Sequence, residues 1–374
     1  MPLHARHPAV VFAVLAALAA PASVASCGGG TDTPGFAPAT SDGKLDAATE
    51  TDGHLDLGSA WPDAATTGAA PLDASPGFDA GAVDASAPAA SCTGKGVAGD
   101  VTVALMVGSA ARTSIVHAPP GYDGTKPLPL ILNFHGFSSN GAEEVLLTRM
   151  NAAADAHGFL VAYPEGIATS WNAGKCCGTA WANAVDDIGF VKALVEKLSK
   201  DYCVDPRRIY ATGMSNGGFL SHRIGCELGD VFAAIAPVAG VLGVEFSSCK
   251  PPRAIPVLQI HGSKDPLVPY AGGYPLVNVG LSGELDFPSV AATLARWRVI
   301  DGCTEESATI YQHGDATCVS WASCQGGAEV ALCTLDGGGH TWPGGLPVPP
   351  LGKTSTDLDA TEAMVSFFAA HPLP

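Results

Sequence analysis

The sequence has few basic side chains and, beyond its first residues, no long apolar run. Lys and Arg number 19 against 36 Asp and Glu among 374 residues, which gives a formal net charge of −17. Such an excess of negative charge repels phosphate backbones, so no nucleic-acid partner is expected. After the head, no stretch approaches the roughly 18 consecutive apolar residues that a membrane-spanning helix requires. The cysteines and histidines show neither zinc-finger spacing nor an H-E-x-x-H motif, so no metal site is expected.

The first residues have the composition of an export signal. Arg6 precedes an apolar run at residues 9–20, which is too short to span a bilayer. Small residues then lead to Cys27, and Val-Ala-Ser-Cys resembles the lipobox of bacterial lipoproteins. We therefore expect residues 1–26 to be a lipoprotein-type signal peptide and Cys27 to be lipidated. The expected location is the cell surface (outer membrane or cell envelope) or the extracellular space. The alternative is ordinary cleavage near Ser26.

A strongly acidic segment of low complexity follows, at residues 27–91. From position 28 onward it holds ten Asp and Glu, one Lys and only three aromatic residues. So few large apolar groups cannot offset the entropy of ordering the chain, and we expect a disordered linker. Membrane contact is expected only through a lipid anchor at Cys27.

Ten further cysteines follow the head, an even number that favours disulfides over metal sites in an exported chain. Cys318 and Cys333 lie on two short apolar runs that are expected to form a hairpin. We therefore expect a bridge between these two residues, with Cys303–Cys324 as the other local bridge. The rest of the connectivity stays open at this stage.

Cys176 and Cys177 are adjacent in the sequence. A bridge between them would close a strained ring, because a disulfide normally needs a wider separation of the two Cα atoms. We therefore expect each of the two to have a separate partner.

Short β-rich runs alternate with helical stretches in residues 92–374. The expected strands are 101–107, 113–117, 128–134, 159–163, 208–212, 233–238, 256–261 and 329–335. The expected helices are 142–157, 186–202, 216–228, 289–300 and 357–370. This alternation predicts one α/β domain with a mostly parallel central sheet and helices on both faces. Functional side chains of such sheets gather at the carboxyl ends of the strands.

Ser215 stands in the motif Gly213-Met-Ser-Asn-Gly217, between an expected strand and an expected helix. In a glycine-rich chain the motif alone is weak evidence. Its context is that of a nucleophile elbow, in which a tight strand-to-helix turn exposes the serine hydroxyl. A plain glycine-rich turn is the alternative.

Two further candidates follow later strands. Asp265 lies in a loop after the strand that ends near His261, and His340 follows three glycines and precedes Trp-Pro-Gly. The chain order Ser, Asp, His is that of α/β-hydrolases. Asp301 or Asp336 as the acid, and His261 as the base, are weaker alternatives.

An oxyanion hole in this fold takes one N–H from the residue after the nucleophile and one from the loop after the third strand. Here the expected donors are the backbone N–H groups of Asn216 and Phe137. His135, in the same loop, is expected to order it. A pocket role for Trp171, Tyr270 and Trp342 is a further hypothesis.

Taken together, these motifs resemble one family, the secreted esterases of the polyhydroxybutyrate depolymerase and feruloyl esterase type, similar to carbohydrate esterase family 1. The segments that carry the resemblance are His135–Phe137, Cys176–Gly178, Asp186–Phe190, Gly213–Gly218, His261–Tyr270 and Gly338–Gly345. The resemblance implies an α/β-hydrolase fold from Cys92 to the C-terminus, and it implies Ser215, Asp265 and His340 as the triad.

The resemblance also implies an ester substrate, without a metal or organic cofactor. Expected substrates are hydroxyalkanoate oligomers or polyester, or feruloylated or acetylated plant polysaccharide. The absence of an added adsorption domain favours soluble oligomers or plant-wall esters. A monomer is expected. An α/β-hydrolase-fold peptidase and a non-catalytic surface binding module are the alternatives.

Overall fold

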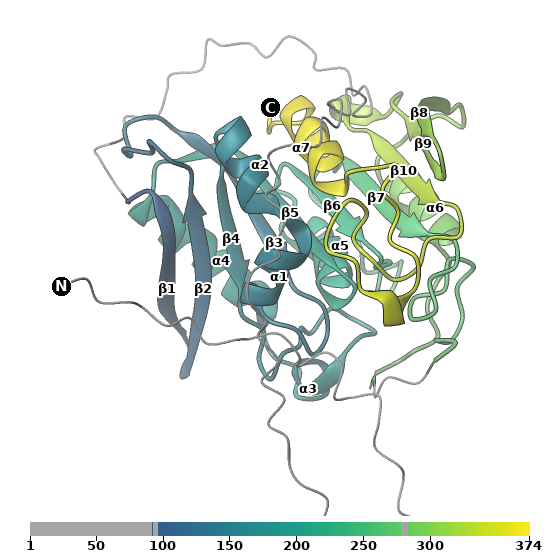
Figure 1. Cartoon of the computed structure of the whole chain (residues 1–374), viewed down its shortest axis with the longest axis horizontal. Helices are drawn as coiled ribbons and strands as arrows, with labels where there is room; N and C mark the ends of the chain where they lie inside the picture. Colours follow the sequence, from purple (N-terminus) through teal and green to yellow (C-terminus); the bar gives the residue numbers. More distant parts are fainter. Residues whose placement is uncertain (1–91, 93–95, 278–280, 282) are drawn as a thin grey trace, which may run out of the picture. The chain divides into compact units, whose positions relative to one another are not determined.

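The computed structural model describes residue 92, residues 96–277, residue 281 and residues 283–374 (Figure 1). The expected signal peptide, the expected linker and Cys27 lie outside these residues. Within the described part, no helix combines the length and apolar character needed to cross a membrane. The same residues contain no cluster of three or more His, Cys, Asp or Glu side chains placed to hold a metal ion.

A single mixed sheet runs through the described residues. Its strands are β1 (Gly99–Val107), β2 (Ala110–Ala118), β3 (Leu128–Phe134), β4 (Leu160–Pro164), β5 (Val204–Met214), β6 (Ala234–Val238), β7 (Val257–Gly262), β8 (Ala308–His313), β9 (Ala316–Trp321) and β10 (Val330–Leu335). The spatial order is β1-β2-β4-β3-β5-β6-β7-β10-β9-β8. From β4 to β10 in that order the strands are parallel, whereas β1, β2, β9 and β8 pair antiparallel with their neighbours.

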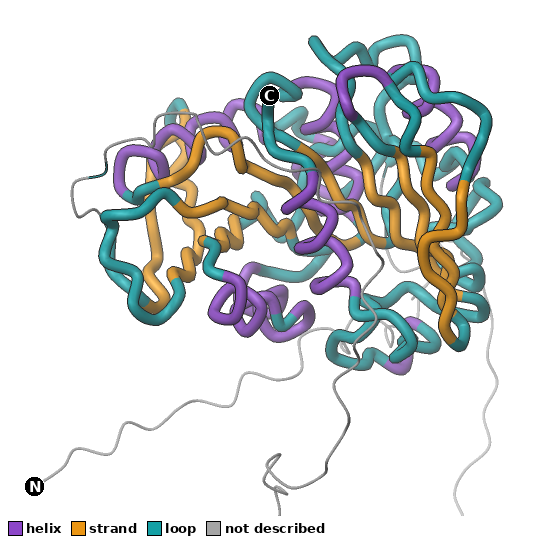
Figure 2. Tube along the Cα trace, turned by 90° about the horizontal axis from the view of Figure 1, so that it is seen from above, coloured by secondary structure: helices purple, strands orange, loops and turns teal. Residues whose placement is uncertain are grey.

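Helices pack on both sides of this sheet, as Figure 2 shows. They are α1 (Gly141–Thr148), α2 (Met150–His157), α3 (Gly178–Ala182), α4 (Asp187–Asp201), α5 (Asn216–Glu227), α6 (Val290–Ile300) and α7 (Ala360–Ala370). Most begin at a side chain that caps the first turn, as Asn140, Asp186, Ser289 and Asp359 do. The layered order and parallel centre give the α/β-hydrolase fold that the sequence predicts.

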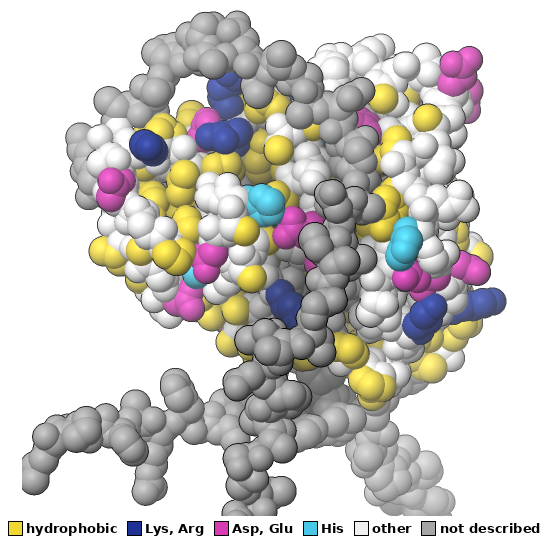
Figure 3. Space-filling view, turned by 45° about the horizontal axis from the view of Figure 1, so that its top comes forward, with side chains coloured by type: hydrophobic (Ala, Val, Ile, Leu, Met, Phe, Trp, Pro, Cys, Tyr) yellow, Lys and Arg dark blue, Asp and Glu magenta, His cyan; other side chains and the backbone are white. Residues whose placement is uncertain are grey.

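Two apolar cores, one on each face of the sheet, hold the layers together. Strand β3 contributes to both, because alternate residues point to opposite faces. Leu130 and Leu132 belong to the core that includes α4, α5 and α6, and Ile131 belongs to the core that includes α2 and α7. On the part of the face in Figure 3 where the described residues are visible, charged side chains lie among apolar and uncharged ones.

Three differences from the expected secondary structure have local causes. The helix expected over 142–157 is two helices, because Arg149 adopts a left-handed conformation (φ 54°) between α1 and α2. Helix α3 and strand β8 were not expected. Strand β8 alternates little in burial along its length, so it lacks the pattern by which strands are recognised.

Five disulfides join the ten cysteines that follow the expected head. Cys318–Cys333 connects β9 to β10, and Cys303–Cys324 is the other local bridge, so both expected pairs are confirmed. The remaining pairs are Cys92–Cys203, Cys226–Cys249 and Cys176–Cys177. The expectation of separate partners for Cys176 and Cys177 was therefore wrong. Every other cysteine in the described residues is already paired, so the two neighbours bond to each other.

Candidate active site

Ser215 occupies the turn between β5 and α5, with φ 56° and ψ −120°. A non-glycine residue at positive φ is uncommon, and such strain clusters at functional sites. The Ser215 N–H donates to the carbonyl of Val238 at 2.9 Å, which ties the turn to the neighbouring strand. The residue is half-buried. The backbone therefore has the form of the nucleophile elbow that the motif predicts.

The two glycines of the motif are required by the carbonyl of Phe134 at the end of β3. A Cβ atom at Gly213 would lie 2.4 Å from that oxygen, and one at Gly217 would lie 1.9 Å from it. Gly136 lies against the serine itself, since a Cβ atom there would be 3.5 Å from the Ser215 Cβ. The small residues thus let the turn approach the loop that follows β3.

Asp265 and His340 are joined by a buried hydrogen bond. His340 Nδ1 lies 2.7 Å from Asp265 Oδ2, and both residues are 2% exposed. Asp265 Oδ1 accepts the N–H groups of Leu267 and Val268, each at 2.8 Å. Burial raises the pKa of this carboxyl. The neighbouring His340 and His261, with their hydrogen bonds, outweigh burial and hold the pKa well below its usual range. The carboxylate is therefore charged and fixed in orientation.

The loops that carry these two residues are bonded to each other. Lys264 N–H donates to Gly338 O at 2.9 Å, and Gly337 N–H donates to Ser263 Oγ at 2.8 Å. A Cβ atom at Gly262 would lie 2.4 Å from the Gly338 carbonyl. Strands β7 and β10 are adjacent and parallel, so their carboxyl ends bring both loops to one edge of the sheet.

The alternative acids lie elsewhere. Asp301 caps the end of α6 and accepts the Ile255 N–H at 2.8 Å. Asp336 bonds to Ser263 Oγ at 3.1 Å on the exposed side of the loop. Neither has a hydrogen bond to His340 among those of the described residues. His261 is buried beside Asp265, with Nε2 3.4 Å from Asp265 Oδ2.

The loop after β3 is ordered by His135. Its Nδ1–H donates to Gly136 O at 2.7 Å, and its Nε2 accepts the Gly166 N–H at 3.0 Å. Burial lowers the pKa of His135 to about 4, with a contribution from Arg112, so the imidazole is neutral at pH 7. Sequence reasoning expected the ordering role of His135 but missed Gly166, because a backbone donor leaves no side-chain signal.

Asn216 is the first residue of α5, and its side-chain amide is also held by hydrogen bonds. Its Oδ1 accepts the Trp171 N–H at 2.7 Å, and its Nδ2 donates to the Trp171 carbonyl at 3.1 Å. The Trp171 indole donates to His135 O at 2.9 Å. Phe137 lies against Gly178, where a Cβ atom would be 2.5 Å from its ring. Both expected oxyanion donors thus belong to segments held in place by neighbouring side chains.

The suggested aromatic pocket is not present in the form expected. Trp171 and Trp342 are 0% exposed. Trp171 packs edge-on against Phe134, and the Trp342 indole donates to Thr361 Oγ1 at 3.1 Å. Tyr270 bonds through its hydroxyl to Thr334 Oγ1 at 2.8 Å. Trp171 and Trp342 are therefore packing residues, whereas Tyr270 is half-buried and its pocket role stays a prediction.

Comparisons with known proteins identify a family and several relatives. The Esterase PHB depolymerase family matches residues 113–292. Feruloyl esterase B of Piromyces equi is 35% identical over 236 residues, covering 61% of this chain and 42% of that protein. Putative esterase NocK of Nocardia uniformis subsp. tsuyamanensis is 35% identical over 289 residues, covering 72% of this chain and 83% of its own. This chain thus spans less than half the length of feruloyl esterase B.

Among solved structures, the acetyl xylan esterase from Aspergillus awamori aligns with a TM-score of 0.48 and 13% identity. The alignment covers 67% of this chain and 96% of that one. The strand order and the parallel pairing of the central strands establish the fold.

Proposed function

Because this chain belongs to the esterase PHB depolymerase family, we propose that Ser215, Asp265 and His340 form the catalytic triad of a serine carboxylesterase. The main support for this proposal is the buried hydrogen bond of 2.7 Å between His340 Nδ1 and Asp265 Oδ2. It belongs to the same sheet edge as the strained turn at Ser215, since β5, β7 and β10 are parallel. Side chains at that edge are where this fold places its chemistry.

The reaction proceeds through an acyl-enzyme. His340 removes the Ser215 proton as the serine oxygen attacks the ester carbonyl, and Asp265 stabilises the imidazolium that forms. The backbone N–H groups of Phe137 and Asn216 stabilise the oxyanion, a contribution of about 3 kcal/mol per donor. His340 then protonates the leaving alkoxide. Finally it activates a water that releases the acid and restores the serine.

The relatives that support a substrate class include a feruloyl esterase and a bifunctional acetylxylan esterase/xylanase. We infer that this enzyme hydrolyses esters of feruloylated or acetylated plant polysaccharide, or of hydroxyalkanoate oligomers and polyester. Parallel assays on methyl ferulate, acetylated xylan and 3-hydroxybutyrate oligomers separate these substrates. A kcat/KM for one of them that exceeds the others by tenfold or more identifies the class.

The triad is tested by Ser215→Ala. We expect this variant to release no p-nitrophenol from a short-chain ester, while Ser248→Ala, at an exposed serine, keeps wild-type activity. Near wild-type activity in Ser215→Ala rejects the triad.

Fluorophosphonate labelling and an amide-hydrolysis assay distinguish the esterase from the two alternative functions, a binding module and a peptidase. A protein that takes no label at Ser215 is a binding module, and one that cleaves amides faster than esters is a peptidase.

The five disulfides indicate that the described residues fold in an oxidising compartment outside the cytoplasm. We infer further that residues 27–91 tether this hydrolase domain, residues 92–374, to a membrane through lipid on Cys27, and that the domain is a monomer. Metabolic labelling with palmitate, in the full chain and in Cys27→Ser, tests the anchor. Equal labelling of the two chains rejects it.

A further inference from the structure

A continuous line of buried polar side chains leads from helix α6 to Asp265, outside the triad itself. It consists of Trp297, His222, Gln259 and His261, none of which is more than 1% exposed. Trp297 comes from α6, His222 from α5, and the other two from β7. Each member is hydrogen-bonded to the next, so the line connects three elements to the acid of the triad.

The direction of the first two hydrogen bonds is fixed by the indole. Trp297 Nε1 lies 3.0 Å from His222 Nδ1, and an indole nitrogen can only donate. His222 Nδ1 therefore accepts, and the imidazole proton resides on Nε2. Nε2 lies 2.9 Å from Gln259 Oε1 and donates to it. Burial lowers the pKa of His222 to about 3, so this ring stays neutral.

Gln259 in turn donates a hydrogen bond to His261, so donation runs in the same direction along the line. Its Nε2 donates to the Gly240 carbonyl at 2.9 Å and lies 3.2 Å from His261 Nδ1. A carbonyl can only accept, so the amide cannot be reversed without placing two oxygens against each other. His261 Nδ1 therefore accepts and Nε2 carries the proton. That N–H donates to Val268 O at 2.9 Å.

The same N–H of His261 faces the carboxylate of Asp265. Nε2 lies 3.4 Å from Asp265 Oδ2, the oxygen that also bonds His340. In the opposite tautomer, a lone pair of His261 would face both this oxygen and the Val268 carbonyl, and the repulsion would turn the carboxylate away from His340. We propose that His261 is a positioning residue for Asp265, with its tautomer set from Trp297 through His222 and Gln259.

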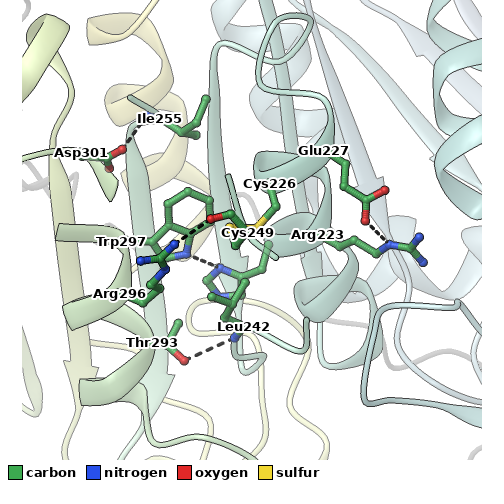
Figure 4. The surroundings of a disulfide bond; sticks show 11 residues. Arg223, Cys226, Glu227, Leu242, Cys249, Ile255, Thr293, Arg296, Trp297 and Asp301 are labelled. Carbon is green, nitrogen blue, oxygen red and sulfur yellow. Dashed lines mark hydrogen bonds and ion pairs between the residues drawn. A yellow bond between two sulfur atoms is a disulfide. The ribbon is translucent and has the colours of Figure 1, made fainter. Parts of the chain in front are cut away.

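This inference rests on the proposed triad, and it adds a function for groups that the mechanism does not use. Covalent and steric constraints hold the line rigid. Figure 4 shows Trp297 beside the Cys226–Cys249 disulfide, which ties α5 to the loop before β7. Arg296, the residue before Trp297, donates to Cys249 O at 2.9 Å. A Cβ atom at Gly225 would lie 3.0 Å from the Trp297 ring, so this glycine allows the close approach of α6 to α5.

The first test compares His261→Gln with His261→Phe. Glutamine can place an amide N–H near the position of the imidazole Nε2–H, whereas phenylalanine keeps the ring volume without a donor. We expect His261→Phe to lower kcat about tenfold with KM within about twofold, because one N–H facing a charged acceptor is lost. His261→Gln should keep kcat within about threefold of wild type. Equal kcat in both variants and wild type overturns the proposal.

The second test acts at the far end of the line. Trp297→Phe keeps an aromatic ring but removes the donor that fixes His222, so we expect kcat to fall about threefold without a change in KM. Thr293→Val is the matched control on α6. It removes the 3.3 Å bond from Leu242 N–H to Thr293 Oγ1 (Figure 4) and leaves the line intact, so its kcat should equal that of wild type. Equal loss in both variants indicates a general loss of packing and overturns the proposal.

A spectroscopic measurement reads the tautomers directly. In the full chain labelled with ¹⁵N-histidine, which has 11 histidines, we expect His222 and His261 in the Nε2–H form at pH 7. A Nδ1–H form of His261 overturns the proposal whatever the kinetics of the variants. The outcomes also separate the two hypotheses. An active Ser215→Ala rejects the triad, whereas an inactive Ser215→Ala with an unimpaired His261→Phe rejects only the positioning role.

Discussion

Arg112 and Asp187 form a buried ion pair, 2.8 Å between Nη2 and Oδ1, that joins strand β2 to the start of α4. The guanidinium also lies 3.8 Å from the centre of the Phe190 ring. Asp187 Oδ2 accepts the Asn172 N–H at 2.7 Å, one residue from the tryptophan that supports Asn216. The pair therefore anchors the loop behind the expected oxyanion hole to the sheet.

Removing one partner of this pair should be costly. We expect Arg112→Met to lower the free energy of unfolding by about 3–5 kcal/mol, because it leaves the buried Asp187 carboxyl without the guanidinium that pairs with it. Arg298→Met is the matched control, since Arg298 also stacks on an aromatic ring but pairs with the exposed Glu305. There we expect about 1 kcal/mol or less. Urea denaturation of both variants measures the difference, and similar losses would contradict the assignment.

The amide of Asn216 should matter for turnover more than for binding. Asn216→Ala leaves the backbone N–H of residue 216 in place but removes both bonds to the Trp171 main chain. We expect kcat on p-nitrophenyl acetate to fall about tenfold, since a donor misplaced by a fraction of an ångström stabilises the oxyanion poorly. Asn183→Ala, at an exposed asparagine, is the control. An unchanged kcat in Asn216→Ala would show that the turn holds the N–H by itself.

The proposed acid of the triad can be distinguished from the two alternative acids. We expect Asp265→Asn to lower kcat by about 10³- to 10⁴-fold, because the amide favours the wrong tautomer of His340. Asp336→Asn, at a carboxylate that accepts a hydrogen bond from Ser263 Oγ, should keep activity within about twofold of wild type. Steady-state kinetics on the same ester decides between them. Substantial activity in Asp265→Asn would return Asp301 and Asp336 to consideration.

Asp301 should make stability depend on pH. Burial raises the pKa of its carboxyl to about 7, opposed by the Ile255 N–H and Arg253. The folded state therefore binds a proton that the unfolded state releases above pH 4, so stability falls as the pH rises from about 4 to 7. The contribution is on the order of 4 kcal/mol. Urea denaturation across this range should show a smaller fall in Asp301→Asn. Parallel curves for wild type and variant would reject the assignment.

The sequence was sufficient for the architecture and for the candidate residues because both have strong local signals. Ser215, Asp265 and His340 each follow a strand or a glycine-rich turn, and parallel strands bring such positions to one edge. The sequence was insufficient where a feature depends on distant partners. The break at Arg149 has no glycine or proline to mark it. The line from His222 to Gln259 joins residues 37 positions apart, and buried polar residues on two elements show no pattern until the elements pack.

The pairing of Cys176 with Cys177 was mispredicted for a related reason. Local strain argues against adjacent partners, but the choice depends on where the other eight cysteines lie in three dimensions. Each of those has a partner already, over separations from 15 residues for Cys318–Cys333 to 111 for Cys92–Cys203. Such a global constraint cannot be read from the spacing of the two cysteines alone.

The Cys92–Cys203 bridge also determines how the molecule bears a mechanical load. Cys203 immediately precedes β5, and Ser215 follows that strand at its other end. A pull on the chain before Cys92 passes through the sulfur atoms into β5, which has β3 and β6 on either side. The force therefore does not peel the edge strand β1 away from β2. It enters the sheet at Cys203, at the end of β5 opposite Ser215, and is shared by the central parallel strands.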